Sequence, residues 1–277
     1  KPQYFAARKL YTLLYKPIRK AVGSSNQIIL SPDGLLNLVP FGSLQDSNGK
    51  YLVESKTITY VTSGRDLMRG GTGIKPESDL FLAANPEYDL AAKSDKTAKR
   101  RYRGMTRSRN FKMTFSPLPG TAEEAKSIPG MLKGKKKAVL TGAKASEAAV
   151  RSVHRPKVLH LATHGFFLED QPEIEMKNRM RSGEKFTLPR GYENPLVRSG
   201  LAFAGANHAS EADSDLDGLL TALEVSGMDL HGTDLVTLSA CETGVGEVKT
   251  GEGVYGLRRA FALTGARNLL MSLWAVA

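Results

Sequence analysis

Apolar and polar positions change their rhythm near residue 75. Over the first 22 residues, apolar side chains recur at three- and four-residue spacing, which predicts an amphipathic helix interrupted near Pro17. Two apolar runs then flank a Pro-Asp-Gly turn within residues 27–39, which predicts a β-hairpin, and residues 57–63 form a further β-rich segment. Residues 1–75 are therefore predicted to be an N-terminal accessory part, a helix with a β-hairpin.

From residue 76 onward, short apolar runs alternate with helical patterns. One helix starts with Thr121 and Glu124 at the spacing of a capping box. Strands that are apolar on both faces and alternate with helices indicate a parallel sheet covered by helices. Residues 76–277 are thus predicted to be an α/β core with a basic insertion at 93–112. The expected strands are 80–84, 137–140, 157–165, 234–241 and 268–276, and the expected helices are 121–128, 146–153, 219–225 and 253–266.

The net charge of +11 is concentrated in two short segments. Residues 93–112 carry nine lysines and arginines against Asp95, and residues 133–137 carry four more lysines, so the rest of the chain is close to neutral. A run this polar with few aromatic residues is typical of a solvated insertion rather than a surface that stacks nucleic-acid bases. Contact with nucleic-acid phosphates stays open as the alternative interpretation.

The cellular setting follows from what the sequence lacks. One cysteine excludes an internal disulfide framework, and neither a signal-peptide pattern nor eighteen consecutive apolar residues occur. A cytoplasmic location is therefore expected. The chain begins with Lys1 and ends inside an apolar run, so we expect a piece of a longer protein whose core is incomplete at its C-terminal end.

Two predicted strand ends carry side chains capable of catalysis. His164 and Gly165 end one strand, and Cys241 ends another. Functional groups of parallel α/β sheets gather at the carboxyl ends of strands, and a thiol needs a base to form its nucleophilic thiolate. The backbone N–H groups of Gly165 and Cys241 could form an oxyanion hole. A lone cysteine is also a common core residue, so a buried, unreactive thiol is the alternative.

Metal and cofactor sites are not expected. His160 precedes His164 by four positions, but in a strand that spacing separates the two residues by about 13 Å, so His160 is expected to be a core histidine. No other histidine has cysteines or carboxylates at metal-ligand spacing. The glycines of "GEGVYG" at 251–256 lack the preceding strand and following acidic residue of a dinucleotide site.

Several long blocks resemble the CHAT family of caspase-like cysteine peptidases, relatives of caspases and separases in clan CD. These blocks are "IILSPDGLLNLVPFGSL", "LFLAANPEYD", "VLHLATHGFF" and "GLLTALEV" continued by "DLVTLSACETGVGEVKTGEGVYGLRRAFALTGARNLLMSLWAV". The resemblance implies a caspase-like sandwich with a mostly parallel central sheet flanked by helices. It also implies a cysteine endopeptidase acting on a protein substrate, with Cys241 as nucleophile, His164 as general base and Gly165 at the oxyanion site. Family members often sit beside tetratricopeptide-type repeats, so a regulatory repeat or partner module outside this chain is expected.

The resemblance also suggests a substrate preference. In the wider clan, a charged pocket beside the nucleophile selects the residue before the cleaved bond, P1. The stretch before the "GLLT" block is acidic, and Asp217 in "DGLLT" matches a family block, which implies a preference for arginine or lysine at P1. Asp217 could instead cap the helix at 219–225. The alternative function is a catalytically silent interaction module that binds a protein or nucleic-acid partner through the basic insertion.

Overall fold

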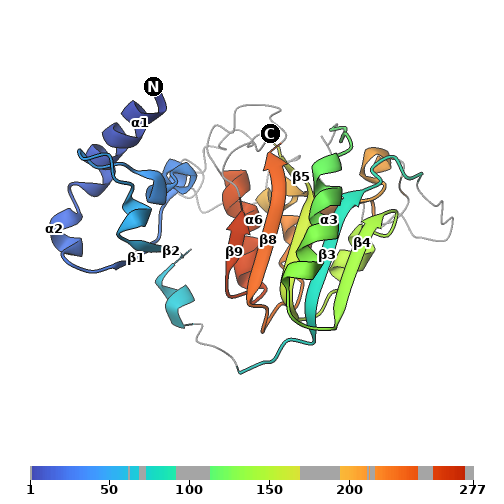
Figure 1. The fold of residues 1–277 in the computed structure, drawn as a ribbon. Helices are drawn as coiled ribbons and strands as arrows, with labels where there is room; N and C mark the ends of the chain where they lie inside the picture. Colours follow the sequence, from blue (N-terminus) through green and yellow to red (C-terminus); the bar gives the residue numbers. More distant parts are fainter. Residues whose placement is uncertain are drawn as a thin grey trace, which may run out of the picture. The chain divides into compact units, whose positions relative to one another are not determined.

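The computed structural model describes residues 2–61, 63–68, 73–91, 113–168, 194–210, 212, 216–242 and 252–271. The chain divides into two compact units, residues 1–70 and residues 71–277 (Figure 1). The basic insertion at 93–112 lies outside the described residues, as does most of the polar stretch after the strand that carries His164. None of the helices in the described part is long and apolar enough to cross a membrane.

The N-terminal unit begins with a helix that is interrupted as predicted. Helix α1 (Pro2–Leu10) continues into a π-helical turn (Tyr11–Tyr15), and the short helix α2 (Arg19–Val22) follows the break near Pro17. The unit buries its own apolar cluster, which consists of Tyr15, Ile28, Phe41, Leu44 and Leu52.

The predicted hairpin is wrong. Strand β1 (Gln27–Leu30) pairs in parallel with β2 (Thr57–Tyr60), while the second apolar run forms a 3-10 helix (Gly34–Leu38). The side chain of Asp33 accepts a 2.9 Å hydrogen bond from the Gly34 N–H, and Gly34 has a φ of +53°. Capping by aspartate at this turn starts a helical segment and so removes the run from strand pairing.

The larger unit contains the central sheet, which has seven strands in the part of the chain described. The strands are β3 (Ser78–Pro86), β4 (Lys137–Gly142), β5 (Pro156–Phe167), β6 (Ser199–Ala202), β7 (Leu219–Thr221), β8 (Leu235–Glu242) and β9 (Leu269–Met271). Strands β4, β3, β5, β8 and β9 are neighbours in that order and all run parallel (Figure 1). Strand β6 pairs antiparallel with the end of β5, and β7 pairs antiparallel with β6. The predicted mostly parallel α/β sheet is confirmed.

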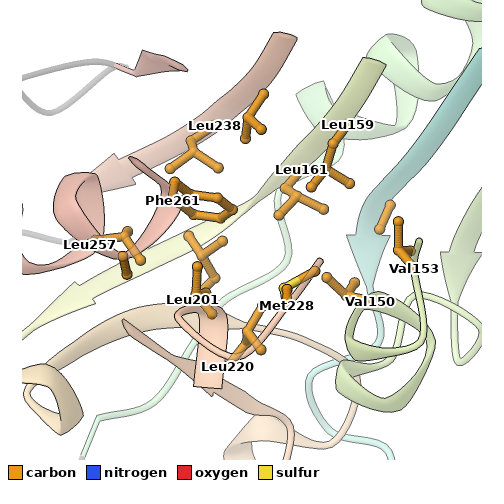
Figure 2. Packing of buried hydrophobic residues seen from close by; sticks show 14 of the residues in the cluster. Val150, Val153, Leu159, Leu161, Leu201, Leu220, Met228, Leu238, Leu257 and Phe261 are labelled. Atoms are coloured by element: carbon orange, nitrogen blue, oxygen red, sulfur yellow. The ribbon is translucent and has the colours of Figure 1, made fainter. Parts of the chain in front are cut away.

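Helices cover both faces of this sheet. Helix α3 (Pro119–Met131) packs on β3, β4 and β5, where its Ala125 meets Leu80 and Leu82. Helices α4 (Glu147–Arg151), α5 (Ala222–Val225) and α6 (Glu252–Leu263) contribute to the core on the opposite face. Figure 2 shows Phe261 of α6 beside Leu161 of that second core. The alternation of side chains along a strand explains the two separate cores.

The start of α3 differs from the prediction. Pro119 occupies the first turn, so Thr121 lies inside the helix and cannot be its N-cap. The Thr121 hydroxyl donates to the Leu118 carbonyl at 2.7 Å and accepts from the Asn85 N–H at 3.0 Å. Glu124 bonds to the sheet instead of completing a capping box. The predicted capping box is therefore wrong.

Candidate active site

His164 lies near the carboxyl end of β5 in an apolar and aromatic pocket. Its side chain is only 4% exposed, and its ring centroid lies 5.3 Å from that of Tyr88 and 5.5 Å from that of Phe115. Nε2 forms a 2.7 Å hydrogen bond with the backbone carbonyl of Ser116. Because a carbonyl only accepts, this bond places the imidazole proton on Nε2.

The other ring nitrogen is thereby left as a base. Nδ1 of His164 is buried and has no hydrogen-bond partner among the described residues. Burial lowers the pKa of His164 below the ordinary value of 6.5, although the hydrogen bond to the Ser116 carbonyl acts in the opposite direction. The favoured form is thus a neutral imidazole with a lone pair on Nδ1, which can accept a proton.

Cys241 lies on the neighbouring strand at the same level. Strands β5 and β8 are parallel neighbours, and their register pairs His164 with Cys241. The predicted parallel arrangement of these two strands is confirmed, and the structure shows that they are immediate neighbours. Residues paired in register lie on the same face of a sheet, about 4.8 Å apart between strands. The backbone therefore brings the two positions together at one strand end.

Gly165 lies where β5 changes partners. Its register neighbour is Glu242 on β8 and Leu201 on the antiparallel strand β6. The Thr163 hydroxyl also bonds to the Ala202 carbonyl of β6, and the Tyr88 hydroxyl lies 2.9 Å from the Thr163 hydroxyl. These contacts fix the backbone on either side of His164. The oxyanion role expected for Gly165 and Cys241 stays a prediction.

Asp217 lies apart from the paired positions, immediately before β7. In the sheet, β5 and β6 separate β7 from β8. The Asp217 carboxylate accepts a 3.0 Å hydrogen bond from the Leu219 N–H. Helix α5 is instead capped by Thr221, which forms a capping box with Glu224. The interpretation of Asp217 as the cap of this helix is therefore wrong, and its role in substrate binding stays a prediction.

Asp217 lies close enough to two buried carboxyl groups, Glu147 and Glu224, for its charge to act on both. Glu147 of α4 accepts hydrogen bonds from Arg151 at 3.0 Å and from the Gly218 N–H at 2.9 Å, and Arg151 also reaches Glu224 at 3.4 Å. Burial, followed by the charges of Glu224 and Asp217, raises the pKa of Glu147 to about 8. Burial raises the pKa of Glu224 to about 7. No sequence pattern indicates that these side chains lie together.

The groups around His164 were also missed from the sequence. Ser116 acts through its backbone carbonyl, and every residue type has this group, so the residue type does not indicate the role. A signal does exist in "SPLP", residues 116–119, because a residue before proline is restricted to extended conformations and two such steps make a stiff segment. Tyr88 and Phe115 look like ordinary core aromatics in the sequence, and both are buried.

His160 is a core histidine with a carboxylate partner. It is 7% exposed, and its Nε2 lies 2.7 Å from Glu124 of α3. Among the residues described, no group of three or more histidine, cysteine, aspartate and glutamate side chains could hold a metal ion. Gly253 and Gly256 of the glycine-rich stretch lie within α6.

A mostly parallel sheet flanked by helices, with histidine and cysteine positions paired at adjacent strand ends, is the architecture of a caspase-like α/β domain. Residues 5–277 match the CHAT domain. The chain belongs to the CHAT domain family, as its sequence blocks suggested.

Two curated relatives carry the same name in two mammals. Tetratricopeptide repeat protein 28 of Homo sapiens is 28% identical to this chain over 288 residues, and the protein of that name in Mus musculus is 27% identical over the same length. Each alignment covers 97% of this chain and 11% of the relative. The chain thus spans about a tenth of the length of the curated relatives it matches.

Proposed function

We propose that this domain is a cysteine endopeptidase in which Cys241 is the nucleophile and His164 is the general base. The observation that carries the proposal is the state of His164: Nε2 is bonded to the Ser116 carbonyl, and Nδ1 is buried, unprotonated and without a hydrogen-bond partner among the described residues. The β5–β8 register supports the assignment because it pairs this histidine with the chain's one cysteine.

In the proposed reaction, the Cys241 thiol gives its proton to Nδ1 of His164, and the thiolate attacks the carbonyl carbon of the scissile peptide bond. The imidazolium then donates this proton to the leaving amine as the C–N bond breaks, which leaves a thioester. A water molecule then gives a proton to Nδ1 as its oxygen attacks the thioester carbonyl. The C–S bond breaks, the imidazolium returns the proton to the Cys241 sulfur, and the products are a carboxylic acid and the free thiol. No external oxidant or cofactor is needed.

The oxyanion of each tetrahedral intermediate needs hydrogen-bond donors. We assign this role to the backbone N–H groups of Gly165 and Cys241, which lie one register step apart on neighbouring strands. Such donors typically contribute a factor of about 10²–10³ to turnover.

The test is cleavage of a panel of fluorogenic peptides that differ at P1. Cys241→Ala should abolish cleavage, and His164→Ala should reduce kcat/KM by about 10²–10⁴-fold, the usual contribution of a general base. Both variants should unfold at nearly the wild-type temperature. His231→Ala, which changes an exposed histidine bonded to Asp229, is the matched control and should keep activity. Wild-type turnover by Cys241→Ala would place the active site elsewhere.

A second part of the proposal concerns specificity. We propose that Asp217 contributes to a pocket that prefers arginine or lysine at P1, because a desolvated carboxylate favours a matching cation and penalises an unpaired group by several kcal/mol. The basic insertion at 93–112 would then be a site of self-cleavage. Asp217→Asn should lose the preference for basic P1 residues, and purified wild type, but not Cys241→Ala, should be nicked within that insertion. Cleavage after leucine or aspartate by an un-nicked wild type would contradict this assignment.

The alternative function is a catalytically silent interaction module. The names of the relatives support this alternative, since both are called tetratricopeptide repeat proteins. A repeat module outside this chain would be a partner under either function. Under this alternative, neither Cys241→Ala nor His164→Ala should change the affinity for the partner, because the basic residues of 93–112 would make the contact. Competition between the whole chain and a synthetic peptide of residues 93–112 for the partner would support this alternative.

A further inference from the structure

A second polar cluster lies deeper along the two strands that carry His164 and Cys241. Glu124 of α3 uses both carboxylate oxygens: Oε1 accepts from the Ser239 hydroxyl of β8 at 2.8 Å, and Oε2 lies 2.7 Å from Nε2 of His160 on β5. One helix side chain therefore bonds to two neighbouring strands at once.

The chemistry of this cluster does not fit a second nucleophile. The Ser239 hydroxyl donates to the carboxylate and not to an imidazole, so His160 cannot take its proton. His160 likewise donates its Nε2 proton to Glu124, because an ionised carboxylate only accepts. Both donors converge on Glu124, which is the pattern of a structural bridge.

The bridge is placed where it can act on the proposed catalytic dyad, His164 and Cys241. Ser239 precedes Cys241 by two residues, and His160 precedes His164 by four, so each bonded residue lies on the same strand face as a dyad position. Glu124 thus ties α3 to both dyad strands below their ends.

The segment that leads into α3 contacts His164 directly. Ser116, whose carbonyl accepts the His164 Nε2 proton, lies three residues before the first residue of α3, Pro119. Thr121 in the first helical turn accepts the Asn85 N–H at the end of β3. The position of α3 on the sheet therefore sets the position of the Ser116 carbonyl.

We propose that Glu124 is a positioning residue for the dyad: its bonds to His160 and Ser239 fix α3 against β5 and β8 and so hold the Ser116 carbonyl on Nε2 of His164. This inference rests on the proposed function, since it assumes that His164 acts on Cys241. Loss of the bridge should let α3 shift and weaken the bond that keeps Nδ1 as the base.

The experiment measures alkylation of Cys241 by iodoacetamide at pH 7 in the whole chain. The protein has one cysteine, so the adduct is read without ambiguity by intact mass. If His164 activates the thiol, His164→Ala should alkylate more slowly than wild type. Glu124→Ala should alkylate roughly 10- to 100-fold more slowly, the order of loss that follows a displacement of about 1 Å at a reacting pair.

Two further variants separate positioning from general stability. Glu124→Gln can still accept from His160 through its oxygen and donate to the Ser239 oxygen through its amide, so it should restore most of the rate. Glu123→Ala removes the neighbouring carboxylate, which is 73% exposed and pairs with Lys126, and should alkylate like wild type. Ser239→Ala removes a single hydroxyl and repeats the test with a smaller perturbation than Glu124→Ala.

The decisive comparison is a double-mutant cycle. If Glu124 acts through His164, Glu124→Ala should cause no further slowing in the His164→Ala background. A folded Glu124→Ala that alkylates at the wild-type rate, or an equal slowing with and without His164, would overturn the positioning role while leaving the proposed dyad intact. Equal rates for wild type and His164→Ala would instead overturn the proposed function, and the positioning role with it.

Discussion

The free energy of unfolding is expected to decrease between pH 5 and pH 8 because two buried carboxyl groups retain protons in the folded chain. Glu147 and Glu224 have side chains that are 2% and 4% exposed. Burial is the main cause that raises the pKa of Glu147 to about 8 and that of Glu224 to about 7, from an ordinary 4.5. Arg151 contacts both carboxyl groups and opposes the shift without cancelling it.

The sign and size follow from proton linkage. Above pH 4.5 the unfolded chain releases the Glu147 proton, whereas the folded chain keeps it until about pH 8. The folded state then binds more protons, so stability falls as pH rises, by up to about 1.4 kcal/mol per pH unit for each such group. Across the window the loss amounts to several kcal/mol, a large part of the roughly 5–15 kcal/mol that holds a domain together.

Urea unfolding at pH 5, 6, 7 and 8 measures this dependence. Glu147→Gln cannot titrate, so its stability should fall less steeply with pH than that of wild type, by about 1.4 kcal/mol per unit between pH 5 and 7. The slope is the measurement, because the variant also alters the bonds to Arg151 and Gly218 and so lowers stability at every pH. Glu123→Gln, at an exposed position, should keep the wild-type slope. Equal slopes for wild type and Glu147→Gln would refute the reasoning.

Two further predictions concern the dyad and the core. Burial lowers the pKa of His164, and only the neutral ring is a base. The kcat/KM for a fluorogenic peptide should therefore fall at acid pH with a midpoint below pH 6.5. A midpoint above pH 6.5 would contradict the assignment of His164 as the general base. Phe261 is 0% exposed, so Phe261→Ala should lower the free energy of unfolding in urea by about 3–5 kcal/mol. Leu263 lies on the same helix but is 46% exposed, so Leu263→Ala should lower it far less. Similar losses for the two variants would show that the helix packs differently.

The parallel strands of the core were predictable because each is a continuous apolar run. Strands β6 (Ser199–Ala202) and β7 (Leu219–Thr221) were not, since three or four residues carry no measurable period. The "LLTALEV" pattern at 219–225 predicts one helix, which is wrong: Thr221 ends β7 and caps α5, so the pattern is divided between a strand and a helix. Their formation depends on the end of β5, which offers β6 a pairing edge.

The candidate site, like the fold, was predictable only in part. The rule that chemistry gathers at the ends of parallel strands placed His164 and Cys241 together, and the register agrees. It could not reveal which ring nitrogen of His164 is protonated, because that depends on the carbonyl of Ser116, 48 positions away in the chain. Contacts over such a distance are set by the packing of α3 on the sheet, and local sequence patterns do not encode them.

The state of His164 connects its stability cost to its chemistry. A buried nitrogen without a hydrogen bond costs about 1–3 kcal/mol, and in the described part of the chain Nδ1 has no partner to offset this cost. Burial in the aromatic pocket of Tyr88 and Phe115 also lowers the pKa of His164, which disfavours the protonated ring near neutral pH. The missing hydrogen bond would be supplied by a donor that keeps its own proton at rest and gives it to Nδ1 only during a reaction. The position paired in register with His164 is occupied by Cys241, and a thiol is such a donor.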